Sequence, residues 1–96
     1  MTLRLVPFLL LSAALGGPAQ ANCYADYKAK QDQPLRLADG VAELPDRGCG
    51  GRDAAASVLA PRLAAAGWTL LNVLSLFGPE GLEERRDSAG EFFLRY

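Results

Sequence analysis

The first 21 residues most constrain what this chain folds into, because they predict an export signal and leave a short remainder. Arg4 supplies a positive charge, Leu5–Leu15 form an apolar core, and Ala19-Gln20-Ala21 has the small-x-small pattern of a cleavage site. An apolar run of about 11 residues is too short to span a membrane as a helix, which takes about 20. We therefore expect residues 1–21 to be removed. The protein would then work in the periplasm or as a secreted protein, with no stable membrane insertion after cleavage.

The remainder, residues 22–96, has room for one small domain and no second core. A core of this size rarely supplies more than about 3–5 kcal/mol of net stability. Cys23 and Cys49 are the two cysteines of the chain, and in an oxidising compartment such a pair predicts a disulfide. Closing a loop of about 27 residues would contribute about 3.5 kcal/mol. We expect the domain to be marginal or unfolded when this bond is reduced.

Charge and composition argue against several classes of function. The chain has ten lysines and arginines against eleven aspartates and glutamates, with no basic patch, so nucleic acid is not an expected partner. It has no histidine, the usual general base near neutral pH and the commonest zinc ligand. A serine nucleophile would need Lys28 or Lys30 as its base, and the cysteines lack redox Cys-x-x-Cys spacing. We expect no catalytic, cofactor-binding or metal site, no cofactor, and no enzymatic activity.

The first part of this domain predicts a short helix followed by a strand. Asn22 can cap a helix running to about Lys30, and Pro34 would end it. Residues 35–44 alternate as a strand does, except at Asp39-Gly40. This dipeptide predicts either a bulge in one strand, which we favour slightly, or a two-residue hairpin turn, which stays open. A bulge would reverse the alternation and group four apolar residues on one face: Leu35, Leu37, Ala42 and Leu44.

An alanine-rich helix is predicted after a glycine-rich loop. Asp53 is suited to cap it, the helix should occupy Ala54–Ala66, and Gly67 fits its end. Pro61 lies in its interior and predicts a kink or the loss of one hydrogen bond. Five apolar positions would face the core: Ala55, Val58, Leu59, Leu63 and Ala66.

Two further strands are predicted, Trp68–Phe77 and Ala89–Tyr96, joined by a charged connection with a turn of helix at Leu82–Arg86. Neither face of the first is polar, whereas a strand with one solvated face alternates cleanly. The predicted fold class is α+β: a small three-stranded sheet, in the order strand-helix-strand-strand, with one helix packed on one face and one disulfide. A right-handed crossover would make the first two strands parallel, and the last would return antiparallel.

The segment Ala64–Val73, AAAGWTLLNV, resembles the signature of a family of small domains of unknown function. Those domains run strand, helix, Gly-Trp-x-Leu strand, and a closing strand with an aromatic-x-Leu-Arg ending, here Phe92-Phe93-Leu94-Arg95. The exported part, including CYADYKAKQD at 23–32 and FGPEGLEER at 77–85, is also similar to small uncharacterised exported proteins of alphaproteobacteria. The resemblance implies an α+β fold and transfers no activity, because its motifs are fold-bearing rather than catalytic.

One helix can cover only one face of such a sheet, so the other face is the best functional clue. A predicted apolar group with a charged rim would lie there, as in many protein interfaces. The candidate interface consists of Leu71, Val73, Phe77, Phe93 and Arg95. We expect this face to pair with a second copy in a homodimer, or with a periplasmic protein partner. The alternative left open is that residues 22–33 fold over it, tethered by Cys23.

The predicted function is therefore that of an exported, non-catalytic domain with a protein-interaction or structural role. The alternative is a binding module for a small molecule or a cell-wall fragment. A pocket lined by Trp68 and Tyr27 with convergent polar groups would favour this alternative.

Overall fold

A computed structural model describes residues 23–96, so the predicted signal over 1–21 lies outside the described residues. The α+β fold class is confirmed: three strands form one antiparallel sheet in the order β2-β1-β3, with helices packed against it. A disulfide joins Cys23 to Cys49, as predicted. The main elements are β1 (Cys23–Gln31), β2 (Arg36–Leu44), α2 (Arg52–Ala65), β3 (Thr69–Phe77) and α3 (Glu83–Ala89). Single 3-10 turns occupy Asp46–Gly48, Pro79–Gly81 and Gly90–Phe92.

The central strand β1 lies where the sequence predicts a short helix, and that prediction is wrong. Ala25, Tyr27 and Ala29 are buried, while the residues between them face the other side of the sheet. This alternation of period two is the strand signal. Alanine and lysine are weak strand formers, so the segment becomes a strand because both neighbouring strands pair with it.

β2 is one continuous strand, with neither a bulge nor a turn at Asp39-Gly40. Its pairing with β1 runs without a shift in register and places Gly40 opposite Tyr27. Because nothing reverses the alternation, the predicted grouping of four apolar residues on one face is wrong. Leu35 and Leu37 are exposed, whereas Ala42 and Leu44 are buried.

Two irregularities in β3 explain why polar and apolar residues do not alternate one by one along this strand. Its pairing with β1 shifts register twice, so Leu71 and Leu74 are extra residues without a partner position on β1. The residues that share the inward face are then spaced by three: Leu70, Val73 and Leu76. Three polar residues lie on the opposite face, Thr69, Asn72 and Ser75, together with Phe77 at the end of the strand.

β2 and β3 both run antiparallel to β1 and therefore run in the same direction as each other, but β1 separates them. The prediction that these two strands run parallel is therefore confirmed, but they are not neighbours, because β1, which was expected to be a helix, inserts between them. The predicted closing strand over 89–96 is wrong. The helical turn predicted at Leu82–Arg86 is real and belongs to α3, and within 23–96 a single bridge, Val41 to Phe93, joins the tail to the sheet.

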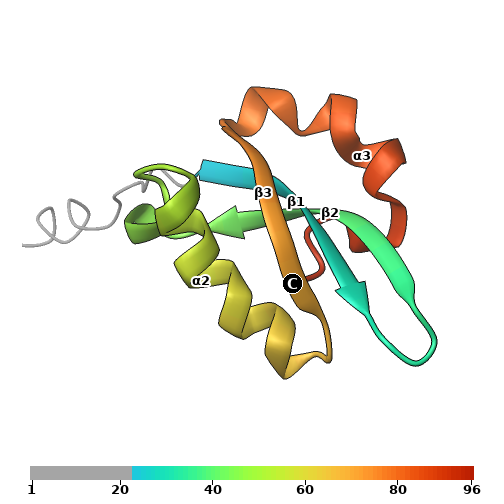
Figure 1. Cartoon of the computed structure of the whole chain (residues 1–96). Helices are drawn as coiled ribbons and strands as arrows, with labels where there is room; N and C mark the ends of the chain where they lie inside the picture. Colours follow the sequence, from blue (N-terminus) through green and yellow to red (C-terminus); the bar gives the residue numbers. More distant parts are fainter. Residues whose placement is uncertain (1–22) are drawn as a thin grey trace, which may run out of the picture.

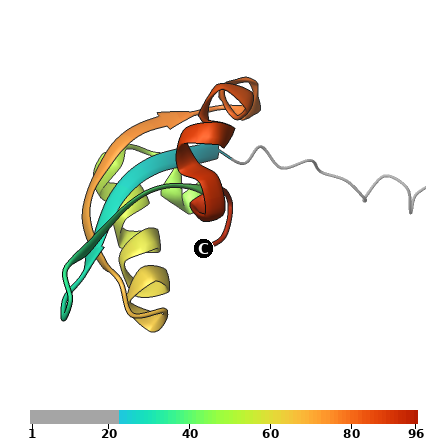
Figure 2. The same ribbon diagram turned by 90° about the vertical axis from the view of Figure 1, so that its right-hand side faces the viewer.

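The two helices lie on opposite sides of the sheet (Figure 1), and the tail after α3 passes along the outer edge of β2 (Figure 2). α2 begins at Arg52 after Gly51, so the predicted cap by Asp53 is wrong, and Pro61 lies inside the helix. Four of its five predicted core positions are buried: Ala55, Val58, Leu59 and Leu63, whereas Ala66 is exposed. With Trp68 and the inward residues of the strands they form the core.

Candidate functional site

The sheet face opposite α2 carries polar side chains along β1 and is covered by α3 at one end (Figure 1). Arg85 links α3 to this face of the sheet. Its Nε donates to Asp26 Oδ2 over 2.9 Å, and its guanidinium lies 3.8 Å from the centre of the Phe77 ring. Ser75 Oγ donates to the other carboxylate oxygen of Asp26 over 2.7 Å. One carboxylate therefore joins α3, β1 and β3.

The other end of this face, towards the β1–β2 turn, is exposed. We call it the open sheet face and define it by Lys28, Leu37, Asp39 and Leu71. Leu37 is 70% exposed and Leu71 is 48% exposed. Lys28 lies between them on β1 and forms an ion pair of 2.7 Å with Asp39. These four side chains, with Ala29 and Ala38, line a small groove of about 160 Å³.

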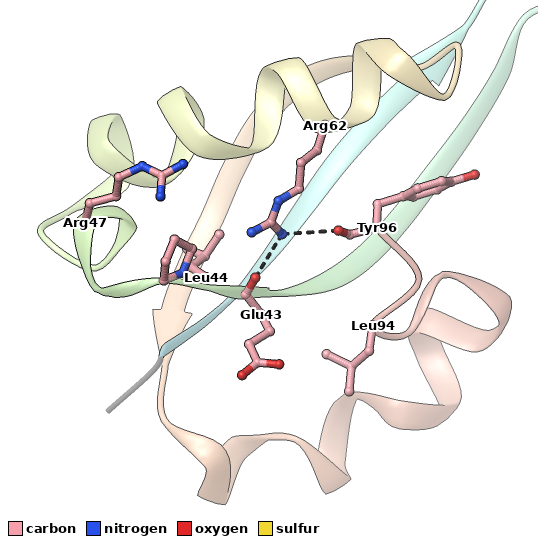
Figure 3. Close-up of a pocket in the computed structure, with 7 residues that line it drawn as sticks. Glu43, Leu44, Arg47, Arg62, Leu94 and Tyr96 are labelled. Carbon is pink, nitrogen blue, oxygen red and sulfur yellow. Dashed lines mark hydrogen bonds between the residues drawn. The ribbon is translucent and has the colours of Figure 1, made fainter. Parts of the chain in front are cut away.

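A larger cavity of about 440 Å³ lies at the outer edge of β2, between α2 and the tail (Figure 3). We call it the edge cavity. Arg62 Nη1 donates to the main-chain oxygens of Glu43, over 2.9 Å, and of Tyr96, over 3.1 Å. The guanidinium of Arg47 lies on the same side of β2 (Figure 3). The residues that line the cavity are Glu43, Leu44, Pro45, Arg47, Arg62, Leu94 and Tyr96.

Both edges of the sheet are partly closed by hydrogen bonds from outside the strands. On β3, Arg52 Nη2 donates to the carbonyl of Leu74 over 3.0 Å, at one of the two irregular positions. On β2, the Leu94 N–H donates to the carbonyl of Val41 over 2.8 Å, and Arg62 occupies the carbonyl of Glu43. Irregular strands and occupied carbonyls protect edges against pairing with another strand. The open sheet face and the edge cavity are therefore better candidates for binding than the strand edges.

The five residues of the predicted interface do not form one surface. Leu71 lies on the open sheet face, whereas Val73 is 6% exposed and belongs to the core. Phe77 is half-buried beneath Arg85, and the half-buried Phe93 ring lies under Arg86. Arg95 is exposed beside the rings of Phe92 and Tyr96. Residues 23–31 do not fold over this face either, since they form the central strand.

The pocket that would favour ligand binding by Trp68 and Tyr27 is not formed by these two residues. Tyr27 is fully buried and Trp68 is 5% exposed, and they line different cavities. Burial raises the pKa of the Tyr27 hydroxyl to about 12, with a smaller contribution from the charge of Tyr96. Among the described residues this hydroxyl has no hydrogen-bond partner. Tyr27 is thus a core residue with an unsatisfied polar atom.

Sequence analysis missed Leu37 and the two arginines of the edge cavity. An unbroken strand alternation through Asp39-Gly40 predicts that Leu37 faces away from the core, as the structure shows. Arg47 and Arg62 come from different elements and line the same cavity only in the folded chain, so no sequence spacing predicts that they share it.

Over residues 23–96, no helix is long and apolar enough to cross a bilayer. The same part of the chain holds no cluster of three or more His, Cys, Asp or Glu side chains that could bind a metal ion. Comparison of the chain with protein-family models, with curated proteins and with solved structures finds no match.

Proposed function

We propose that this protein is an exported, non-catalytic interaction domain that associates weakly with a second copy through the open sheet face. The observation that carries the proposal is the pair of exposed leucines, Leu37 and Leu71, on the two strands that flank β1. Strands lie about 4.8 Å apart, so these side chains stand about 10 Å apart with Lys28 between them. Protein interfaces combine an apolar core with a polar rim, and the two leucines supply the apolar part of such a contact.

The charges around the leucines favour a second copy as the partner. Lys28 pairs with Asp39, and Lys30 pairs with Asp32 over 3.3 Å, so the rim holds both signs in equal number. A two-fold axis brings the same patch of both copies together, which lets each lysine face an aspartate of the other copy. A stable interface buries roughly 800 Å² per partner, and two partly exposed leucines with their neighbouring charges offer little apolar surface, so we expect a transient dimer.

Export rests on two supports. Residues 1–21 have the composition of a signal, and the Cys23–Cys49 bond is of the kind that persists in oxidising compartments. The resemblance to small exported bacterial proteins agrees with this placement and adds no activity.

Sedimentation equilibrium of the disulfide-bonded protein, from about 10 μM to about 1 mM, tests self-association in the range expected for a weak contact. We expect the weight-average mass to rise with concentration and to stay monomeric in a Leu37→Ser, Leu71→Ser variant. Leu94→Ser is the matched control, because Leu94 is 43% exposed but lies on the edge cavity. A strict monomer, or a dimer that survives the double substitution, contradicts the proposal.

A further inference from the structure

A second hollow adjoins the open sheet face on the side of α3, and it has a volume of about 230 Å³. We call it the α3 cavity. The side chains that line it include those of Asp26, Lys28, Asp39, Leu74, Arg85 and Ser88. Lys28 and Asp39 also line the groove of the open sheet face, so the groove and the cavity share this ion pair as their boundary. A chain that covers the open sheet face can therefore reach the α3 cavity.

The α3 cavity suits an apolar side chain better than an ion or a small molecule. Its charged groups are already paired with one another, in the ion pairs Lys28–Asp39 and Asp26–Arg85. Its volume lies below the range of about 300–1,000 Å³ that ligand pockets occupy. Half-buried Leu74 supplies aliphatic surface, which a second aliphatic side chain would remove from water.

α3 restricts how a second copy can approach the open sheet face. A helix is about 10–12 Å in diameter with its side chains, and stacked sheets lie about 10 Å apart. α3 therefore fills the layer in which the sheet of a second copy has to lie. Figure 2 shows α3 and the β1–β2 turn, residues 32–35, at opposite ends of the sheet. Two copies with their strands antiparallel across the contact keep the two helices apart, and each turn then points towards α3 of the other copy.

The β1–β2 turn carries Leu35, an apolar side chain that is 65% exposed and lies outside the open sheet face as defined above. On β2, position 38 lies at the middle of the groove, between Leu37 and Asp39. This position is three residues from Leu35 and three residues from Val41, which borders the α3 cavity. Three residues of a strand span about 10 Å. A two-fold axis over position 38 therefore places Leu35 of each copy over the α3 cavity of the other.

We propose that Leu35 of each copy enters the α3 cavity of the other copy, beside the Lys28–Asp39 ion pair. This inference rests on the proposed self-association and specifies how the two copies are arranged in it. Leu37 and Leu71 then supply the apolar surface at the centre of the contact, and Leu35 supplies an apolar anchor at each end.

Amide chemical shifts of the ¹⁵N-labelled, disulfide-bonded protein, recorded from about 50 μM to about 1 mM, test this arrangement. We expect concentration-dependent shifts at residues 35–39 and 71, and also at 85–89, which include the part of α3 that borders the cavity. Shifts on the open sheet face without shifts at 85–89 overturn this inference and leave the proposed self-association intact. No concentration dependence at any residue contradicts both.

Leu35→Ser should weaken self-association about tenfold, because the anchor loses its apolar surface. At an equal fraction of associated protein, it should also lose the shifts at 85–89. Leu35→Met should keep both, since methionine also fills irregular apolar gaps. Leu94→Ser is the matched control, because Leu94 is an exposed leucine on the edge cavity. Association of Leu35→Ser at the strength of the wild type, or shifts at 85–89 that persist in it, overturns the proposal.

Discussion

The ring of Tyr27 in β1 lies against Gly40, the residue opposite it in β2, in the space that a side chain at position 40 would fill. A Cβ built on Gly40 overlaps the outer ring atoms and the hydroxyl oxygen of Tyr27. The glycine therefore serves a close approach across the strand pair rather than a turn or a bulge. Gly40 thereby makes room for Tyr27, the largest fully buried side chain of the core.

Gly40→Ala should destabilise the protein by about 1–3 kcal/mol, because the new methyl group forces the buried ring to move in a packed core. Urea unfolding of the disulfide-bonded protein, followed by tryptophan fluorescence, measures the change. In a Tyr27→Leu background the same substitution should cost much less, since the overlapping atoms are gone. Gly50→Ala is the control, because its nearest neighbour would lie in ordinary contact at 3.9 Å. Equal costs at positions 40 and 50 would falsify the packing argument.

The Tyr27 hydroxyl makes stability depend on alkaline pH. Its pKa is raised from 10.0 to about 12 in the folded protein, so the folded state holds the proton where the unfolded state releases it. The free energy of unfolding is unaffected by this group below pH 10. Between pH 10 and about 12 it falls by up to about 1.4 kcal/mol for each pH unit.

Tyr27→Phe isolates this effect. The variant should be about 1 kcal/mol more stable at neutral pH, because it removes a buried hydroxyl without a hydrogen-bond partner among the described residues. Its stability should also fall less steeply than that of the wild type from pH 10 upwards. Urea unfolding at pH 7, 9, 10 and 11 measures both effects. If the two proteins keep parallel pH profiles, the hydroxyl does not titrate at a different pKa on unfolding.

Reduction of the Cys23–Cys49 bond should remove about 3.5 kcal/mol of stability, from the entropy of a loop that spans 26 positions. The bond ties the start of β1 to the loop before α2, so its loss frees the end of the central strand. Thermal unfolding with and without reductant measures the effect. A Cys23→Ser, Cys49→Ser variant should match the reduced protein, and it should be insensitive to reductant. A reduced protein as stable as the oxidised one contradicts this account.

The elements that sequence alone predicts well are those whose burial pattern is visible locally. The helix expected over Ala54–Ala66 occupies Arg52–Ala65, and the strand expected over Trp68–Phe77 occupies Thr69–Phe77. An alanine-rich run with apolar residues at helical spacing and a nearly uninterrupted apolar run each specify one state. The disulfide also follows from the cysteine count together with the predicted export signal.

The elements that sequence alone does not predict depend on contacts with segments that are distant in the sequence. β1 consists of small, charged and amide residues with two tyrosines, and its state depends on pairing with β2 and β3. The tail ending Phe92-Phe93-Leu94 has strand-forming residues, yet the Phe92 ring packs edge-on against Trp68 at 5.2 Å. That contact and a single bridge to β2 replace a fourth strand.

The sites follow the same division. Of the residues predicted to form an exposed apolar group opposite α2, Leu71 lies exposed on that face. The register shifts in β3 turn Val73 into the core instead. A residue-by-residue alternation cannot place side chains beyond such a shift. That Arg47 and Arg62 line one cavity depends on how α2 packs on the sheet, which no local sequence pattern encodes.

The Asp26–Arg85 ion pair should contribute more to stability than the Lys28–Asp39 pair on the same sheet face. The side chains of Asp26 and Arg85 are each 23% exposed, whereas those of Lys28 and Asp39 are 50% and 61% exposed. Solvent weakens exposed pairs to roughly 0–0.5 kcal/mol, while a half-buried pair with further hydrogen bonds retains about 1–2 kcal/mol. Asp26 has such a bond from Ser75.

Two double-mutant cycles measure this difference by urea unfolding, one with Asp26→Ala and Arg85→Ala, the other with Lys28→Ala and Asp39→Ala. We expect a coupling energy of about 1–2 kcal/mol in the first and below about 0.5 kcal/mol in the second. Raising the salt concentration should erase the second coupling and leave most of the first, because screening acts mainly on exposed charges. Since Arg85 is the ionic link between α3 and β1, Arg85→Ala should also speed amide hydrogen exchange over Glu83–Ala89. Unchanged exchange in α3 would show that the helix is held by its apolar contacts, such as buried Ala89, and not by this pair.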